Sequence, residues 1–220
     1  RLDNNINLIS CDPGIGKSEI MKSFKNKCSP KYWTIMITPN DVHSFFDSSK
    51  LPETTNYTDL FEKFIVNEKC QSLKKLEQRF FEMCVQKNNV VYVWDALDEI
   101  LQEHLESVSR IILGFSTKGF LQWITSRRHL KPFLEKKFSL LALSINQFDE
   151  QEQQNYIRKR LASFISVDEI EMAIEKIRSS FAIIEHVNIL GIPLQIFMVT
   201  ELFRQNKDKY LKLMENIFLL

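Results

Sequence analysis

Glycine is scarce in this chain, and two of its five glycines stand two residues apart, at Gly14 and Gly16. They lie between an apolar, strand-like run at 6–10 and a helical pattern at 18–27. Glycine allows the backbone of a tight turn to approach a ligand, and the following helix directs its positive end at that turn. A strand, a glycine turn and a helix in this order predict an α/β fold with an anion site at the turn.

The turn reads Cys-Asp-Pro-Gly-Ile-Gly-Lys-Ser over 11–18. This matches the phosphate-binding pattern G-x-x-x-x-G-K-[ST], except that Cys11 replaces the first glycine. This replacement bears on how tightly the loop binds phosphate. The Lys17 ammonium can reach the β- and γ-phosphates of a nucleotide, and the Ser18 hydroxyl can bind Mg²⁺. The alternative is a chance match in a turn, which the flanking strand and helix disfavour. The predicted nucleotide-binding residues here are Pro13, Gly14, Ile15, Gly16, Lys17, Ser18 and Glu19.

A second pattern is an apolar strand, 90–94, that ends in the acid Asp95. An acid at the tip of a buried strand would hold Mg²⁺, mostly through water. Asp98 and Glu99 follow within one turn, and either could orient or deprotonate a water that attacks the γ-phosphate. The alternative is an acidic helix N-terminus. It explains Asp98 or Glu99 alone, but not an acid directly after five apolar residues.

A third apolar run, 120–125, ends in Thr125, Ser126 and Arg127. Ligands of parallel sheets lie beyond the carboxyl ends of the strands, so these residues should lie near the same phosphates. Thr125 or Ser126 could detect the γ-phosphate by hydrogen bonding, and Arg127 could neutralise its charge. Taken alone, this string of residues also fits a solvated basic turn.

Strand-like and helical patterns alternate through the first two thirds of the chain and then give way to helices alone. We expect strands at 6–10, 32–38, 90–94, 120–125 and 138–144, and helices between them at 18–27, 57–66, 72–86 and 100–113. Further helices are expected at 149–164, 167–181, 193–205 and 208–218. This order predicts a mainly parallel sheet flanked by helices, followed by a small all-α domain. The expected domains are 1–147, the nucleotide-binding core, and 148–220, the helical domain.

The motifs CDPGIGKS, VVYVWDALDEI and LQWITSRRHL, in this order, resemble the NACHT family of signal-transducing P-loop ATPases within the STAND class. The segment Leu-Gly-Ile-Pro-Leu around Pro193 resembles the family's G-x-P motif, and the resemblance implies that this proline packs near the adenine. It also implies ATP or ADP with Mg²⁺ as ligands, slow hydrolysis, and self-association on nucleotide exchange. Cys11 and Arg128 depart from the family pattern, and we expect that the chain does not include the family's winged-helix domain.

Composition and charge narrow the classes of partner, metal site and location that this chain could have. The net charge of +1 gives no electrostatic reason to expect a nucleic acid partner. The four cysteines show no zinc spacing, and no apolar run is long enough to span a bilayer. The cysteines are expected to be reduced thiols of a cytoplasmic protein. Because the chain opens without a methionine and closes on an apolar run, we expect a fragment of a longer protein with flanking domains missing on both sides. We also expect a protein partner, which the sequence does not identify.

Three functions are consistent with these motifs. The first is an ATP/ADP switch that changes conformation and forms a homo-oligomer in its active state, as the resemblance implies. The second is a steadily cycling AAA+-like ATPase that remodels a partner. The third is a non-hydrolysing scaffold, and Cys11 is the only feature that favours this hypothesis.

Overall fold

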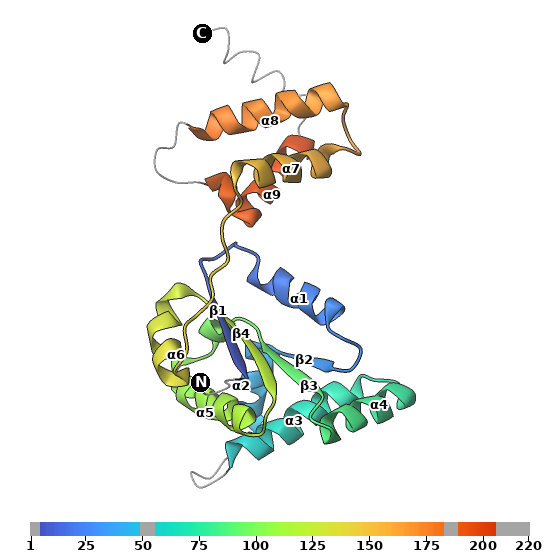
Figure 1. Cartoon of the computed structure of the whole chain (residues 1–220), viewed down its shortest axis with the longest axis vertical. Helices are drawn as coiled ribbons and strands as arrows, with labels where there is room; N and C mark the ends of the chain where they lie inside the picture. Colours follow the sequence, from blue (N-terminus) through green and yellow to red (C-terminus); the bar gives the residue numbers. More distant parts are fainter. Residues whose placement is uncertain (1–4, 49–55, 183–188, 206–220) are drawn as a thin grey trace. The chain divides into compact units, whose positions relative to one another are not determined.

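The computed structural model describes residues 5–48, 56–182 and 189–205 (Figure 1). These residues form two compact units. The first contains the chain up to Asp12 together with Lys17–Ile145, and the second contains Pro13–Gly16 together with the chain from Asn146.

The first unit is built on four parallel strands in the order β1-β4-β3-β2. Their bounds are β1 Ile6–Ser10, β2 Trp33–Ile37, β3 Val90–Trp94 and β4 Leu121–Ser126, so four predicted strands are confirmed. All four strands run the same way, so their carboxyl ends meet at one edge of the sheet. The α/β fold with a parallel sheet flanked by helices is therefore as predicted.

The helices of the first unit are α1 Lys17–Lys27, α2 Pro39–Ser48, α3 Tyr57–Gln71, α4 Lys75–Gln86, α5 Gln102–Thr117 and α6 Lys131–Phe138. Two short 3₁₀ turns, η1 Leu97–Glu99 and η2 Arg128–Leu130, follow β3 and β4. The sequence patterns did not predict α2 or α6. The start of α2 nevertheless carries a readable signal, because Asp41 accepts hydrogen bonds from the backbone N–H and hydroxyl of Thr38 at 2.8 and 2.9 Å.

The predicted fifth strand, 138–144, is wrong as a strand. Phe138 is the last residue of α6, and Ser139 ends that helix in the left-handed conformation, at φ 52°. Beyond it, Leu143 forms a single parallel bridge with Ile9 of β1. The prediction failed because Pro132 opens a helix that takes in Phe138, and because the apolar run is not a buried one: Leu141 is 86% exposed.

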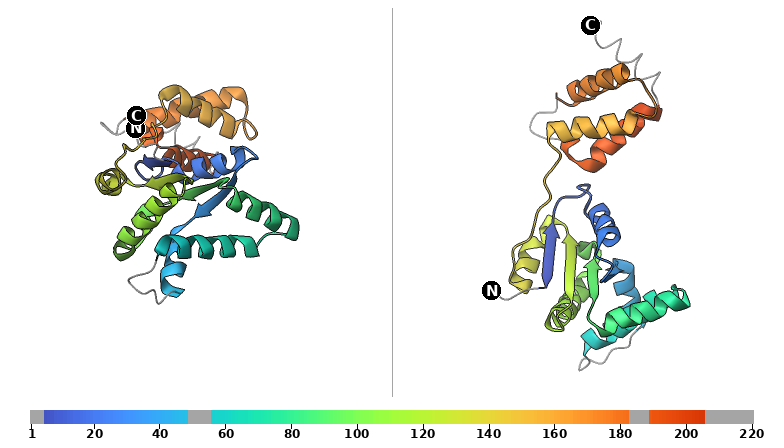
Figure 2. Two further views of the ribbon diagram at one scale, coloured as in Figure 1. Left: turned by 60° about the horizontal axis from the view of Figure 1, so that its bottom comes forward. Right: turned by 45° about the vertical axis from the view of Figure 1, so that its right-hand side comes forward.

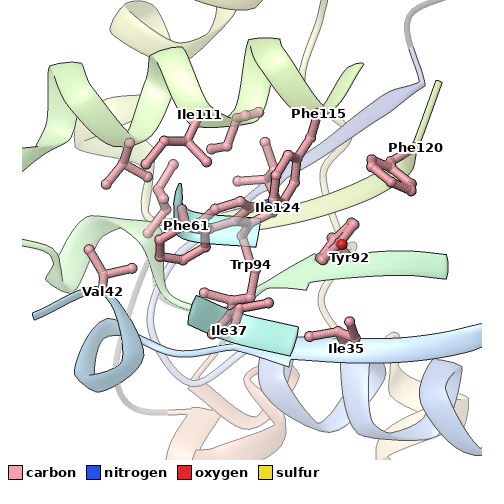
Figure 3. Packing of buried hydrophobic residues seen from close by; sticks show 14 of the residues in the cluster. Ile35, Ile37, Val42, Phe61, Tyr92, Trp94, Ile111, Phe115, Phe120 and Ile124 are labelled. Carbon is pink, nitrogen blue, oxygen red and sulfur yellow. The ribbon is translucent and has the colours of Figure 1, made fainter. Parts of the chain in front are cut away.

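The core of the first unit lies between one face of the sheet and the helices that cover it, and it is rich in aromatic side chains (Figure 3). Phe61 of α3 stacks on Trp94 of β3 with ring centroids 5.4 Å apart, and Tyr92 contacts Phe115 of α5 at 4.4 Å. Each such ring removes a large apolar area from water. These contacts fix α3 and α5 against the strand that ends in the acidic motif.

One polar side chain, Gln122 of β4, is fully buried beside this core. Its Oε1 accepts a hydrogen bond from Trp94 Nε1 at 3.1 Å, and its Nε2 donates to the Ile112 carbonyl of α5 at 2.9 Å. A buried amide is tolerated when its donors and acceptors are paired. Gln122 thus links β3, β4 and α5.

The second unit contains α7 Glu150–Leu161, α8 Val167–Ala182, η3 Ile189–Gly191 and α9 Pro193–Gln205, packed on a small core of their own (Figure 2). α7 begins with a capping box. Asp149 accepts from the Glu152 backbone N–H at 2.8 Å, and Glu152 accepts from the Asp149 N–H at 2.9 Å. The helix predicted at 208–218 lies outside the described residues. In the described part of the chain, no helix is both long and apolar enough to cross a membrane.

The Gln122 bridge yields a stability prediction. Gln122→Leu keeps a similar volume but leaves Trp94 Nε1 and the Ile112 carbonyl without their partners, so the free energy of unfolding should fall by about 2 kcal/mol. Urea unfolding followed by tryptophan fluorescence measures this loss. Gln102→Leu, at an exposed position of α5, is the matched control and should change stability by less than about 0.5 kcal/mol. Equal losses in the two variants would contradict the structural role of the bridge.

Candidate phosphate-binding site

The predicted phosphate loop connects β1 to α1, and Gly14 and Gly16 have positive φ angles of 79° and 94°. These angles favour glycine. A Cβ built on Gly16 meets no heavy atom within 4 Å in the described chain, so the space beside this glycine is open to a ligand. The Lys17 Nζ donates to the carbonyls of Cys11 and Asp12, both at 3.0 Å. The ammonium therefore lies over the loop, where a phosphate oxygen could replace the two carbonyls.

Gly14 belongs to the second unit and is packed tightly there. A Cβ at this position would lie 3.1 Å from Ile192 Cγ2 and 3.2 Å from Leu194 Cβ. The Gly14 carbonyl accepts a hydrogen bond from the Leu194 N–H at 3.1 Å. Pro193, the predicted adenine neighbour, is the first residue of α9 and lies between these two contact residues.

Cys11, which stands where the loop pattern has glycine, contacts the segment that follows α6. The side chain is buried, and its Sγ accepts a hydrogen bond from the Ile145 N–H at 3.0 Å. Its own N–H donates to the Ser126 carbonyl at 3.2 Å. The thiol therefore packs between the loop and the segment around Leu143 and Ile145, which follows α6 and forms a bridge with β1.

Asp95 follows β3 directly, and its carboxylate is held by Thr125 of β4. The Thr125 hydroxyl donates to Asp95 Oδ1 at 2.7 Å and accepts from the Ala96 N–H at 2.8 Å. Ala96 has a positive φ of 56°, which turns the chain directly after the acid. Thr125 is fully buried. It fixes one oxygen of Asp95 and leaves the other available for a metal-bound water.

Asp98 and Arg127, both predicted to act on the γ-phosphate, are paired with each other. Arg127 donates from its backbone N–H to Asp98 Oδ1 and from its Nε to Asp98 Oδ2, both at 2.9 Å. The Asp98 side chain is only 3% exposed. Glu99 lies 3.3 Å from Arg127 Nη2 and is 54% exposed. Of the two candidate bases, Glu99 is therefore the one that water can reach, and Asp98 is suited to position Arg127.

The remaining predicted residues differ in accessibility. Ser126 is fully buried, and its hydroxyl donates to the Arg127 carbonyl at 3.3 Å. Ser18 is partly exposed in the first turn of α1. Glu19 is exposed and pairs with Lys22 at 2.6 Å, and this hydrogen bond raises the pKa of Lys22. Ile15 is buried, so its contribution to a phosphate would come from its backbone.

The donor set fits Mg²⁺ rather than a metal held by protein alone. The described residues contain no group of three or more His, Cys, Asp or Glu side chains that could hold a metal ion. Mg²⁺ usually takes one or two protein ligands and completes its shell with phosphates and water. The Ser18 hydroxyl and the Asp95 carboxylate are ligands of this kind.

Besides the pair of Asp98 and Arg127, sequence reasoning missed two further pairings. The register of β3 and β4 pairs Trp94 with Ile124, so the next two residues, Asp95 and Thr125, face each other. That pairing was readable, because each is the first polar residue after its apolar run. The exposed pair between Asp12 and Arg128, at 3.1 Å, had no such signal.

No protein-family model and no curated protein sequence matches this chain. Among solved structures, the Walker-type ATPase of Pyrococcus abyssi aligns with 99% of this chain and 69% of its own, at 11% identity and a TM-score of 0.51. The chain has a P-loop ATPase fold. Domain III of the replication initiation protein DnaA from Thermotoga maritima aligns with 92% of this chain and 86% of its own, at 14% identity and a TM-score of 0.49. PCH-2 of C. elegans aligns at 15% identity and a TM-score of 0.41, and the match covers 75% of this chain but only 44% of PCH-2.

The Thr125 hydroxyl gives a prediction specific to this P-loop ATPase fold. Thr125→Val removes the hydroxyl at nearly constant volume and leaves Asp95 Oδ1 and the Ala96 N–H without a partner. The free energy of unfolding should fall by about 2 kcal/mol, measured by urea denaturation. Thr117→Val in α5 is the control, because that exposed hydroxyl only returns a bond to its own helix. If stability fell only in the control variant, the hydrogen bond from Thr125 to Asp95 would not have the proposed structural role.

Proposed function

We propose that this chain binds ATP or ADP with Mg²⁺ at the loop between β1 and α1. The observation that carries the proposal is the position of Lys17, whose ammonium donates to the two loop carbonyls of Cys11 and Asp12. Lys17 would bind the β- and γ-phosphates, and Ser18 and Asp95 would hold Mg²⁺, which supplies charge neutralisation to the phosphates. The parallel sheet supports this assignment, because it brings the ends of β1, β4 and β3 to one edge.

We further propose that the chain acts as a nucleotide-dependent switch of the NACHT type, as its motifs suggest. A ligand shifts a conformational equilibrium only if it binds the two states with different affinity. The Arg127 guanidinium is paired with Asp98 and Glu99. A γ-phosphate would compete with these two acids for Arg127, whereas ADP has no group at that position. ATP and ADP would thus favour different arrangements of the Arg127 pair, and a homo-oligomer would form in the ATP state.

The accessible carboxylate of Glu99 also supports a second function, a steadily cycling ATPase that remodels a partner. Glu99 could orient or deprotonate a water for attack on the γ-phosphate. We favour the switch, because Glu99 is paired with Arg127 and would have to leave it for each turnover. The scaffold function is the weakest, since Cys11, the residue that favoured it, is directed to Ile145.

Lys17→Ala should abolish nucleotide binding with little change in fold, because this ammonium is directed at the loop and not at the core. Fluorescence titration with a labelled ADP measures binding, and circular dichroism measures the fold. Lys27→Ala, at the exposed end of the same helix, is the control and should bind as the unchanged chain does. Retained binding in the Lys17 variant would remove the basis of the proposed site.

A non-hydrolysable ATP analogue should change the oligomeric state of the chain, measured by sedimentation, while ADP leaves it unchanged. Hydrolysis separates the two functions. A switch should turn over well below about 1 per second, and a remodelling ATPase at or above it. Glu99→Gln should abolish hydrolysis and retain nucleotide binding. Equal sedimentation with both nucleotides, together with fast turnover, would replace the switch by the cycling ATPase.

A further inference from the structure

One edge of the sheet lacks a partner strand in the described part of the chain, and that edge is β2. Its pairing with β3 uses alternate residues: the Trp33 N–H donates to Asn89 O, and the Asp95 N–H donates to Ile37 O, both at 2.9 Å. In a parallel ladder the residues between these face the other side of the strand. The backbone groups of Thr34 and Met36 are therefore directed outward, and the described residues provide them with no hydrogen bond.

A groove runs along this edge. The groove has a volume of about 380 Å³. It is lined by β2, by α1 on one side, and by the end of α3 and the turn that follows it on the other. Figure 1 shows β2 between α1 and the pair α3 and α4. Thr34 is one of the residues that line this groove, and its hydroxyl is buried with no hydrogen-bond partner in the described part of the chain. The outward backbone groups of Thr34 and Met36 are the hydrogen-bonding groups that this edge offers to an occupant of the groove.

The charged side chains that line the groove are two lysines. Lys25 of α1 is exposed at its rim, and Lys69 of α3 lines it while pairing with Asp41 at 2.7 Å. No Asp or Glu side chain is among the residues that line the groove. The groove therefore favours an occupant that carries acidic side chains.

An apolar surface continues from the groove onto α4. Leu76, Phe80 and Met83 follow helical spacing and are 79%, 51% and 50% exposed. The Phe80 ring lies 6.3 Å from Trp33 of β2, and the neighbouring Tyr32 is 44% exposed. A small polar ligand would leave this surface uncovered, whereas a polypeptide that lies along β2 would reach it.

We propose that the β2 edge binds an extended segment of a partner protein by strand addition, and that this segment alternates acidic and apolar residues. Its backbone would pair with Thr34 and Met36, as added strands do at other sheet edges. Side chains alternate across a strand, so one set would meet Lys25 and the other would meet Phe80 and Tyr32. This surface is separate from the phosphate loop, so the proposal does not depend on the proposed function.

The first test uses a synthetic peptide of about nine residues that alternates glutamate and valine. At about 1 mM peptide, amide NMR signals of Thr34 and Met36 should shift, and their hydrogen exchange should slow. Two control peptides keep the test specific. One replaces glutamate by lysine, and the other carries an N-methyl group on every valine, which removes its hydrogen-bond donors along one edge. Neither control should protect these amides. No shift with the glutamate peptide, or equal shifts with all three, overturns the proposal.

Variants of the chain provide the second test. Met36→Pro removes an outward N–H at an edge position where proline is tolerated, and it should weaken peptide binding by about tenfold. Lys25→Glu should weaken binding of the glutamate peptide and strengthen binding of the lysine peptide. Lys136→Glu, on the exposed surface of α6, makes the same charge change elsewhere and should leave both affinities unaltered. Equal effects of the two lysine variants would show that net charge alone attracts the peptide, and would overturn the proposal.

Discussion

The hydrogen bond from Thr125 to Asp95 connects the ends of two neighbouring strands, and the geometry of the site depends on it. β3 and β4 are in register up to Trp94 and Ile124, so the next residue of each strand faces the other across the sheet edge. Three residues beyond Asp95 and two beyond Thr125, the chains meet again in the pair of Asp98 and Arg127. Each carboxylate therefore has a fixed orientation before any ligand is considered, which is the condition for a preorganised charged site.

The core behind this edge limits how far β3 and β4 can shift. Gln122 connects Trp94 to the backbone of α5, and Tyr92 and Trp94 contact Phe115 and Phe61. A slide of β4 along β3 would break the amide bridge inside an apolar environment, where unpaired polar groups are costly. Packing on one side of the sheet and hydrogen bonds at its end thus enforce the same register.

Four strands and most helices of the first unit could be predicted from the sequence, because buried parallel strands read as short apolar runs between helical patterns. The same criterion failed at 138–144, where apolar residues continue from a helix into a mostly exposed segment. The candidate site was predicted as a set of residues at one sheet edge, which strand order and direction support. Its internal pairing was not predicted. Asp98 and Arg127 were each assigned to a phosphate, since sequence spacing cannot tell which charges neutralise each other across two loops.

The reactivity of the Cys11 thiol depends on local opening of the structure around it. Cys11 is 1% exposed, and its sulfur accepts a hydrogen bond from the Ile145 N–H. The segment of Ile145 otherwise joins β1 by two backbone hydrogen bonds, at Leu8 and Ser10. A reagent can reach this sulfur only when that segment separates from β1. The alkylation rate of Cys11 would then report the frequency of this separation, in the way that amide exchange reports the opening of a helix.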